Sequence, residues 1–175
     1  MDISTLNSRS GSDTPTPLHL RHPATGDLLW DRQPSGQPGD PDYEPGKPVL
    51  VWLYGAESDS VQTAQKAIRE RRLTGKDTGK RSGSRGSKVK VDDRDDRSVA
   101  EFHRDTAEAA IPLISHFENI ERDGKPLSSS DDDKTWFLNL QVMNLRNDTG
   151  EMSFLEQVLD HASTRGNYLG NAKPS

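Results

Sequence analysis

The stretch that decides the fold reads His116-Phe117-Glu118-Asn119-Ile120-Glu121-Arg122-Asp123-Gly124-Lys125-Pro126-Leu127. We expect it to leave an apolar helix, to turn at Asp123-Gly124 and to stop at Pro126. An Asp-Gly pair between short extended runs predicts a tight turn, because both residues accept a positive φ. A turn of this kind carries no chemistry, so the stretch informs on architecture and not on a reaction.

The composition indicates a modest core. The 175 residues fit one domain, or a small core that carries long flexible segments. Only 30% of the residues are hydrophobic and the mean hydropathy is -0.90, below the usual values for a globular domain. The apolar residues are clustered, which predicts a core beside disordered stretches and not disorder throughout.

Several classes of site and location are excluded by the same inventory. The chain has no cysteine, which excludes disulfides, thiolate metal sites and cysteine nucleophiles. Residues 1–6 lack a basic region followed by an apolar run, so we expect no signal peptide. No window approaches the roughly 18 apolar residues of a membrane-spanning helix. The net charge of -5 favours solubility and is too small to steer nucleic acid globally. We therefore expect a cytoplasmic protein without a membrane anchor.

The N-terminal half predicts a β-hairpin unit and one helix, over residues 16–73. A polar, flexible tail over residues 1–15 precedes it. Alternating apolar residues predict a strand at 16–22, and a nearly continuous apolar run predicts the best strand at 49–54. Between them lies a loop at 31–47, because its density of proline and glycine fits no regular element. Ser58 or Asp59 then caps a helix to about Leu73, with Val61, Ala64 and Ile68 on its apolar face.

The C-terminal half is expected to be helical over residues 97–164 around the Asp-Gly turn, after a flexible charged linker at 74–96. A helix at 97–117 should be kinked or split by Pro112. A helix capped by Asp131 to Asp133 follows, then a turn at 147–150, a helix at 151–163 and a tail at 165–175. The sequence thus predicts an α+β fold: a small N-terminal antiparallel sheet or hairpin, a helical C-terminal half and disordered insertions.

Motifs for catalysis, metal binding or cofactor binding are not recognisable in the chain. His19 and His22 would point to opposite faces of a strand, so they cannot share a metal ion. The glycine-rich run at 82–88 lacks the Walker spacing and a preceding strand. The aspartates at 92–96 and 131–133 lack the ligand pattern of an EF-hand, and acidic residues are common at helix N-termini. We therefore expect no enzyme, no cofactor and no metal.

Residues 74–90 carry six lysines and arginines against Asp77, a local charge of +5 (six positive minus one negative). Such a loop can bind nucleic acid through phosphates, but it has no aromatic residue on which a base could stack. The simpler interpretation is a solvated linker beside an acidic run. We expect no nucleic-acid partner.

Three further stretches carry a resemblance. They are residues 19–29, with His22-Pro23-Ala24-Thr25-Gly26; residues 48–59, with Gly55-Ala56-Glu57-Ser58; and residues 165–171, with Arg165-Gly166-Asn167-Tyr168-Leu169. With residues 117–127, they follow the same order as similar segments in the tail assembly chaperones of long-tailed bacteriophages, which this chain resembles over about two thirds of its length. It differs from that family by the loop at 31–47, the basic loop at 74–90 and a more polar setting around Trp136-Phe137-Leu138.

The resemblance implies a non-catalytic protein that acts in the cytoplasm of the infected bacterium and is absent from the mature virion. Such chaperones keep the tape measure protein soluble and help to recruit tail tube subunits. Two alternatives remain: a structural virion component (head–tail connector or tail terminator), for which self-association into rings is expected, and a nucleic-acid-binding accessory protein that uses residues 74–90.

Candidate partner-binding residues are aromatic or aliphatic. Those on the predicted helix faces are Trp136, Phe137, Phe154 and Leu155, and those after the last helix are Tyr168 and Leu169. The alternative for the helix residues is that they pack the small core. The alternative for Tyr168 and Leu169 is a strap packed back on the domain, in place of a free docking peptide.

Overall fold

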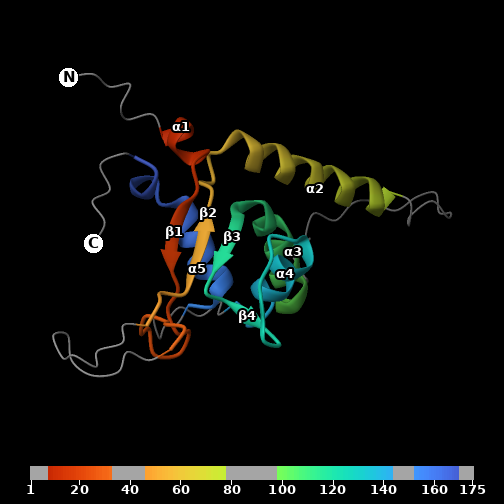
Figure 1. Ribbon diagram of the computed structural model, residues 1–175. Coiled ribbons are helices and arrows are strands. Elements are labelled where there is room, and N and C mark those ends of the chain that lie inside the picture. Colours follow the sequence, from red (N-terminus) through yellow and green to blue (C-terminus); the bar gives the residue numbers. More distant parts are fainter. Residues whose placement is uncertain (1–7, 33–45, 78–97, 144–151, 170–175) are drawn as a thin grey trace, which may run out of the picture.

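The computed structural model describes residues 8–32, 46–77, 98–143 and 152–169. The strands are β1 (Thr16–His19), β2 (Leu50–Leu53), β3 (Ile114–Glu118), β4 (Glu121–Arg122) and β5 (Lys125–Pro126). The helices are α1 (Ser8–Ser12), α2 (Asp59–Asp77), α3 (Val99–Ala110), α4 (Asp131–Leu138) and α5 (Phe154–Ser163), with 3-10 turns η2 (Ile111–Leu113) and η3 (Arg165–Asn167). The predicted α+β class is confirmed (Figure 1).

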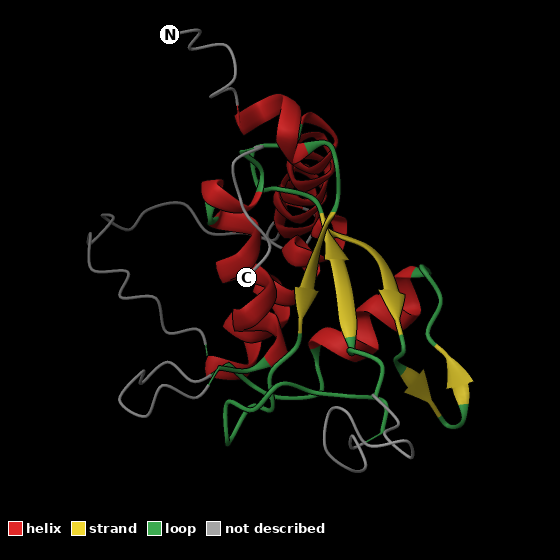
Figure 2. Cartoon of the chain, turned by 60° about the vertical axis from the view of Figure 1, so that its left-hand side comes forward, coloured by secondary structure: helices red, strands yellow, loops and turns green. Residues whose placement is uncertain are grey.

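One three-stranded antiparallel sheet organises the molecule, in the order β1-β2-β3. Side chains alternate across β2: Val51 and Leu53 are fully buried, whereas Trp52 between them is only half-buried. Helices α3, α4 and α5 lie on the side of Val51 and Leu53, and no helix covers the other face in the described part of the chain (Figures 1 and 2). The core between sheet and helices contains Leu20, Val51, Leu53, Val61, Ala107, Ala110, Leu113, Ile114, Leu127, Phe137, Leu138, Leu155, Val158 and Ala162.

The predicted helix over residues 97–117 is wrong in its last third. Helix α3 ends at Ala110, and Pro112 sits in the first turn of η2. Proline lacks an N–H and its ring clashes with the preceding turn, so the helical hydrogen bonds cannot continue. The chain turns extended at Ile114, and β3 pairs with β2 through Val51 and Phe117. The C-terminal half therefore supplies the third strand of the sheet.

The Asp-Gly turn is confirmed, although it follows a strand and not a helix. Asp123 has φ 54° and Gly124 has φ 75°, and they join β4 to β5. Asn119 also has a positive φ, of 58°, and its Nδ2 donates a hydrogen bond of 2.8 Å to the carbonyl oxygen of Pro48. This bond ties the turn segment to the chain that enters β2.

The N-terminal tail predicted over residues 1–15 is wrong for the described residues from Ser8 onward. Ser12 is buried, its carbonyl oxygen accepts from the N–H of Gly55 at 3.0 Å, and Asp13 accepts from the hydroxyl of Ser58 at 2.6 Å. A Cβ on Gly55 would lie 2.4 Å from Ser12 Oγ, so glycine permits this approach. Residues 8–15 thus belong to the folded domain.

The C-terminal tail predicted over residues 165–175 is likewise wrong for its described part. Tyr168 is 6% exposed, and its hydroxyl donates to the carbonyl oxygen of Leu53 at 3.4 Å. Arg165 forms an ion pair of 2.7 Å with Glu57. A Cβ on Gly11 would lie 1.9 Å from the carbonyl oxygen of Tyr168, so α1 packs directly on this segment. The strap interpretation describes Tyr168 better than the free docking peptide.

The helix starts follow from their caps. Ser98 and Glu101 form a capping box at α3, and Ser153 and Glu156 form another at α5. Helix α4 is capped by Ser130, and the three aspartates that were predicted to cap it occupy its first turn. These caps set the helix starts within three residues of the predicted ones.

Some predictions fall outside the described residues. They concern residues 33–45 of the proline- and glycine-rich loop, 78–96 of the charged linker, the turn at 147–150 and the end of the C-terminal tail.

Helix α2 reaches Asp77, four residues past the predicted end at Leu73. Among the described helices, none combines the length and the apolar character that crossing a membrane requires.

Candidate functional site

The predicted partner-binding residues divide into buried and partly exposed ones. Phe137 is 1% exposed and Leu155 is 0% exposed, so both belong to the core. Phe154 packs against that core from a partly buried position. The Phe137 ring lies 5.1 Å from the Phe154 ring, nearly parallel, and 5.2 Å from the ring of Phe117. This aromatic cluster joins β3, α4 and α5, so packing the core accounts for its residues.

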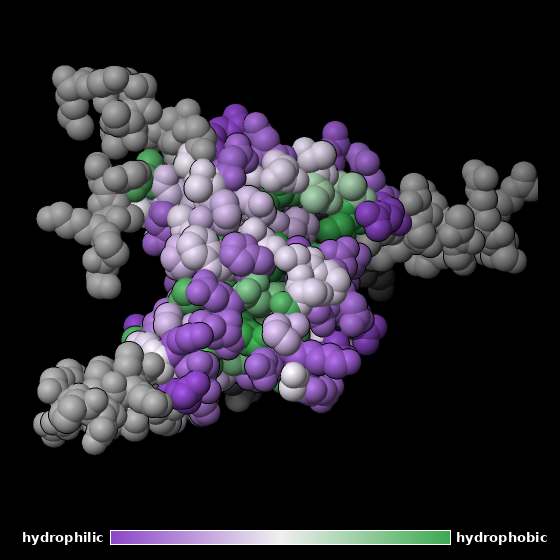
Figure 3. All heavy atoms as spheres, in the orientation of Figure 1, coloured by the Kyte–Doolittle hydropathy of each residue, from purple (hydrophilic) through white to green (hydrophobic). Residues whose placement is uncertain are grey.

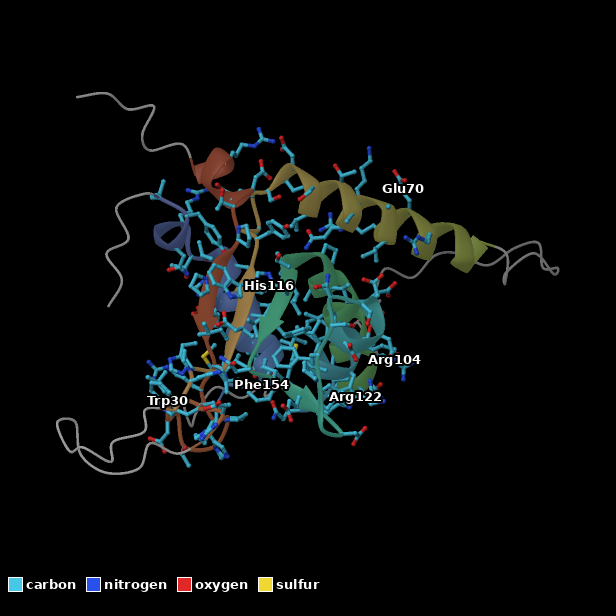
Figure 4. All side chains as sticks on the ribbon, viewed as in Figure 1. Trp30, Glu70, Arg104, His116, Arg122 and Phe154 are labelled. Atoms are coloured by element: carbon cyan, nitrogen blue, oxygen red, sulfur yellow. The ribbon has the colours of Figure 1, made fainter. Side chains whose placement is uncertain are left out.

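Trp136 lies at the edge of α4 and remains partly exposed. The guanidinium carbon of Arg122 lies 5.1 Å from the centre of its ring, and Arg122 also pairs with Asp132 at 3.2 Å. The cation and the ring attract each other because the ring face is electronegative. These contacts fasten the β4–β5 hairpin to α4 (Figure 4).

Tyr168 and Leu169, predicted together, differ in exposure. Tyr168 is buried, and burial raises the pKa of its hydroxyl above 10.0. Leu169 follows at a partly buried position, and its N–H donates to the carbonyl oxygen of Arg165 at 3.1 Å. A partner can reach Leu169, but it cannot reach Tyr168 without opening the fold.

A surface groove lies between the projecting helix α2 and the body of the molecule. Its volume is about 320 Å³, and its apolar lining comes from Ala64, Ala67 and Ile68 on α2 and from Ile111 and Pro112 in η2, directly after α3. In Figure 3, hydrophobic side chains gather at the upper right of the molecule, beneath α2. In the groove, apolar side chains of two separate segments face solvent together.

Charged groups surround this apolar floor, and one of them is half-buried. Arg71, Glu108, Asp131 and Lys134 complete the lining. Burial lowers the pKa of the Lys134 amine, while the nearby charge of Asp131 raises it. Gln65 Nε2 donates to the carbonyl oxygen of Ala109 at 3.0 Å, which fixes α2 against α3. The groove thus has a fixed inner end, and α2 extends away from the body beyond it (Figure 1).

The uncovered face of the sheet carries a second group of exposed rings. Trp52 on β2 and His116 on β3 stack with their ring centres 5.3 Å apart and an angle of 13° between planes. The indole N–H of Trp52 donates to Glu118 at 3.1 Å. These contacts are satisfied within the sheet, so this face is a weaker candidate than the groove.

The two aspartates with lowered pKa values do not lie together at one site. Asp31 has a lowered pKa because the backbone N–H of Lys47 donates to it, and Asp133 has a lowered pKa because of Ser128. The two residues line different cavities. Among the described residues, no three His, Cys, Asp or Glu side chains are placed to hold a metal ion. What the groove can do chemically is bind an apolar surface with charges at its rim.

Sequence reasoning found one wall of the groove and missed the other. The helical spacing of Val61, Ala64 and Ile68 predicted an apolar face on α2, where Val61 is buried and Ile68 is partly exposed. Ile111 and Pro112 were placed inside a helix, and nothing indicated that they would face α2. The available signal was Pro112 itself, which marks a change of direction and hence a surface.

Comparisons of this chain with protein-family models, with curated proteins and with solved structures find no match.

Proposed function

We propose that this protein is a non-catalytic chaperone of phage tail assembly that keeps the tape measure protein soluble and helps to recruit tail tube subunits. It would act in the cytoplasm of the bacterial host and be absent from the finished particle. The proposal starts from the four short stretches that resemble this family in the same order along the chain. The proposal assigns a catalytic role to no residue.

The residues of these stretches serve the architecture, as expected for motifs without a reaction. His22 Nδ1 accepts from the N–H of Ala24 at 3.2 Å, and Gly26 has φ 75° in the same turn. Asn119 binds the carbonyl oxygen of Pro48, and Arg165 pairs with Glu57. Since these polar groups bind other parts of the fold, the surface for a partner must be formed by other side chains.

The groove under α2 is the observation that carries the proposal. A chaperone that holds a helical client needs a modest apolar surface, from which the client can later be released. An amphipathic helix commonly binds by laying its apolar stripe into such a groove. Each apolar side chain that is removed from water contributes about 25 cal/mol per Å². A groove of about 320 Å³ therefore suits moderate and reversible binding.

Co-expression with the tape measure protein of the same phage or prophage tests the proposal. We expect the client to be soluble and to co-purify with the wild-type chain. The variant Ile68→Lys places a charge in the groove and should lose the soluble client. Gln62→Lys places the same charge on an exposed position of α2 and should keep it. Thermal unfolding of both variants verifies that the fold persists.

Two outcomes of the co-expression experiment would contradict the proposal. If the client stays insoluble and the chain alone forms rings, the protein is better described as a structural virion component. If Gln62→Lys and Ile68→Lys act alike, the groove does not bind the client.

A further inference from the structure

The ammonium group of Lys134 lies in the groove, and the nearby charge of Asp131 compensates it only in part. Lys134 lies on α4 and its amine pKa is lowered by burial. Within the described part of the chain, no carboxylate lies at ion-pair distance from this ammonium group. A half-buried cation that no carboxylate meets at ion-pair distance costs free energy, and a carboxylate from a partner recovers part of that cost.

The shape around Lys134 suits a helix. Ala64 and Ala67 present methyl groups on α2, so the backbone of a partner can approach closely. Ile68 and Ile111 supply the larger apolar contacts beside them. Helix α2 forms one long wall, which is the geometry in which helices dock by their apolar stripes.

An extended peptide is a poorer match, because the edges of the sheet are protected. Pro17 on β1 is exposed and has no N–H to donate. On β3, the register shifts between Ile114 and His116, so Ser115 has no partner on β2. An edge with a proline and an edge with a bulge both disfavour pairing with an added strand.

We propose that the groove between α2 and α4 binds an amphipathic helix that carries an acidic residue at the border of its apolar stripe, and that Lys134 forms an ion pair with this residue. The inference rests on the proposed function in one respect: the tape measure protein would be the natural source of the helix.

Two designed peptides test the proposal without that assumption. Each has roughly 20 residues, enough to form a helix in water, and they differ only by Glu or Lys at the border of the apolar stripe. Fluorescence anisotropy with the full chain should show about tenfold tighter binding of the Glu peptide, equivalent to about 1.4 kcal/mol. Lys134→Glu should reverse this preference. Lys134→Met, which keeps the length of the side chain, should abolish it.

The place of binding is tested by crosslinking. The chain has no cysteine, so Ala67→Cys provides a single position for a photoactivatable maleimide. Ala67 lines the groove, and the control Gln62→Cys lies on an exposed position of the same helix. We expect the Glu peptide to crosslink from position 67 and not from position 62.

The outcomes separate this inference from the proposed function. Equal affinity for the two peptides, or binding of neither, overturns the inference. So does crosslinking from position 62 alone. If the Glu peptide binds at position 67 while the tape measure protein stays insoluble, the inference stands and the proposed function fails. If the client is soluble but crosslinks only from position 62, the proposed function stands and the inference fails.

Discussion

Small residues lie in two regions of this protein that have opposite character. At the terminal clasp, which we define as α1, Gly55 and Tyr168, the space beside each glycine is occupied: a Cβ on Gly11 would meet a backbone oxygen at 1.9 Å, and one on Gly55 would meet Ser12 at 2.4 Å. At the groove, Ala64 and Ala67 face an open volume of about 320 Å³.

A small side chain has a different consequence for packing in the clasp than in the groove. In the clasp, small size lets two parts of the chain touch, so the contact is closed and belongs to folding. In the groove, small size leaves a surface free, so the contact is available to another molecule. Stability measurements should therefore respond strongly to changes in the clasp and weakly to changes in the groove.

Removal of the Tyr168 ring should have the largest effect. Tyr168 is 6% exposed, and truncation of a buried aromatic side chain to alanine costs about 3–5 kcal/mol. We expect Tyr168→Ala to lower the free energy of unfolding by about 3 kcal/mol, measured by urea denaturation. Tyr168→Phe keeps the ring and loses the hydroxyl group, with its long hydrogen bond to Leu53 and its interaction with Thr16, so the stability should fall by about 1 kcal/mol. An unchanged stability of Tyr168→Ala would favour the free docking peptide.

A methyl group at Gly11 should have the second largest effect. The atom that it meets is the carbonyl oxygen of Tyr168, which belongs to the backbone and cannot rotate away. Overpacking of this kind costs about 1–3 kcal/mol, although alanine is otherwise the better helix residue. Gly166→Ala is the matched control, since no atom lies within 4 Å of the added Cβ. Equal unfolding midpoints for the two variants would show that the clasp is loose.

The elements of the fold were predictable wherever a local pattern determined them. The apolar run at β2, the turn at Asp123-Gly124 and the first turns of α2, α3 and α5 all follow from neighbouring residues. Strand β3 was not predictable in this way. The spacing of Ile114 and Phe117 fits a helix, and it fits a strand only because the register is irregular at Ser115. The pairing with Val51, 66 residues before Phe117, decides between the two.

The clasp and the groove were harder to predict for the same reason. Ser12 and Tyr168 lie in polar, glycine-containing segments that resemble tails. They are buried because Ser12 packs on Gly55 and Tyr168 packs on Gly11. In the groove, the apolar stripe of α2 was visible, but the opposite wall at Pro112 depended on the third strand. Both sites are made by contacts between distant segments, which local patterns do not encode.

Protonation of His161 should weaken the clasp at mildly acidic pH. Its Nε2 lies 2.9 Å from Thr16 Oγ1, its ring packs edge-on to Tyr168, and burial lowers its pKa below 6.5. The unfolded chain therefore binds a proton at a higher pH than the folded chain, so stability is full above about 6.5 and falls as the pH drops below that value. The urea midpoint of His161→Gln should change less between pH 7.5 and pH 5.5 than the midpoint of the wild-type protein. If the midpoints of the two proteins changed equally over this pH range, His161 would not be the group responsible.

Filling the groove should have the smallest effect on folding and a clear effect on binding. Ala67 is exposed and faces the open volume, so Ala67→Leu adds a side chain without displacing a neighbour. We expect the free energy of unfolding to change by no more than about 0.5 kcal/mol. The same side chain occupies the space that a docked helix needs, so binding of the Glu peptide should weaken several-fold. If Ala67→Leu instead destabilised the protein as strongly as Gly11→Ala, the groove would be a closed contact like the clasp, and the distinction between the two regions would be lost.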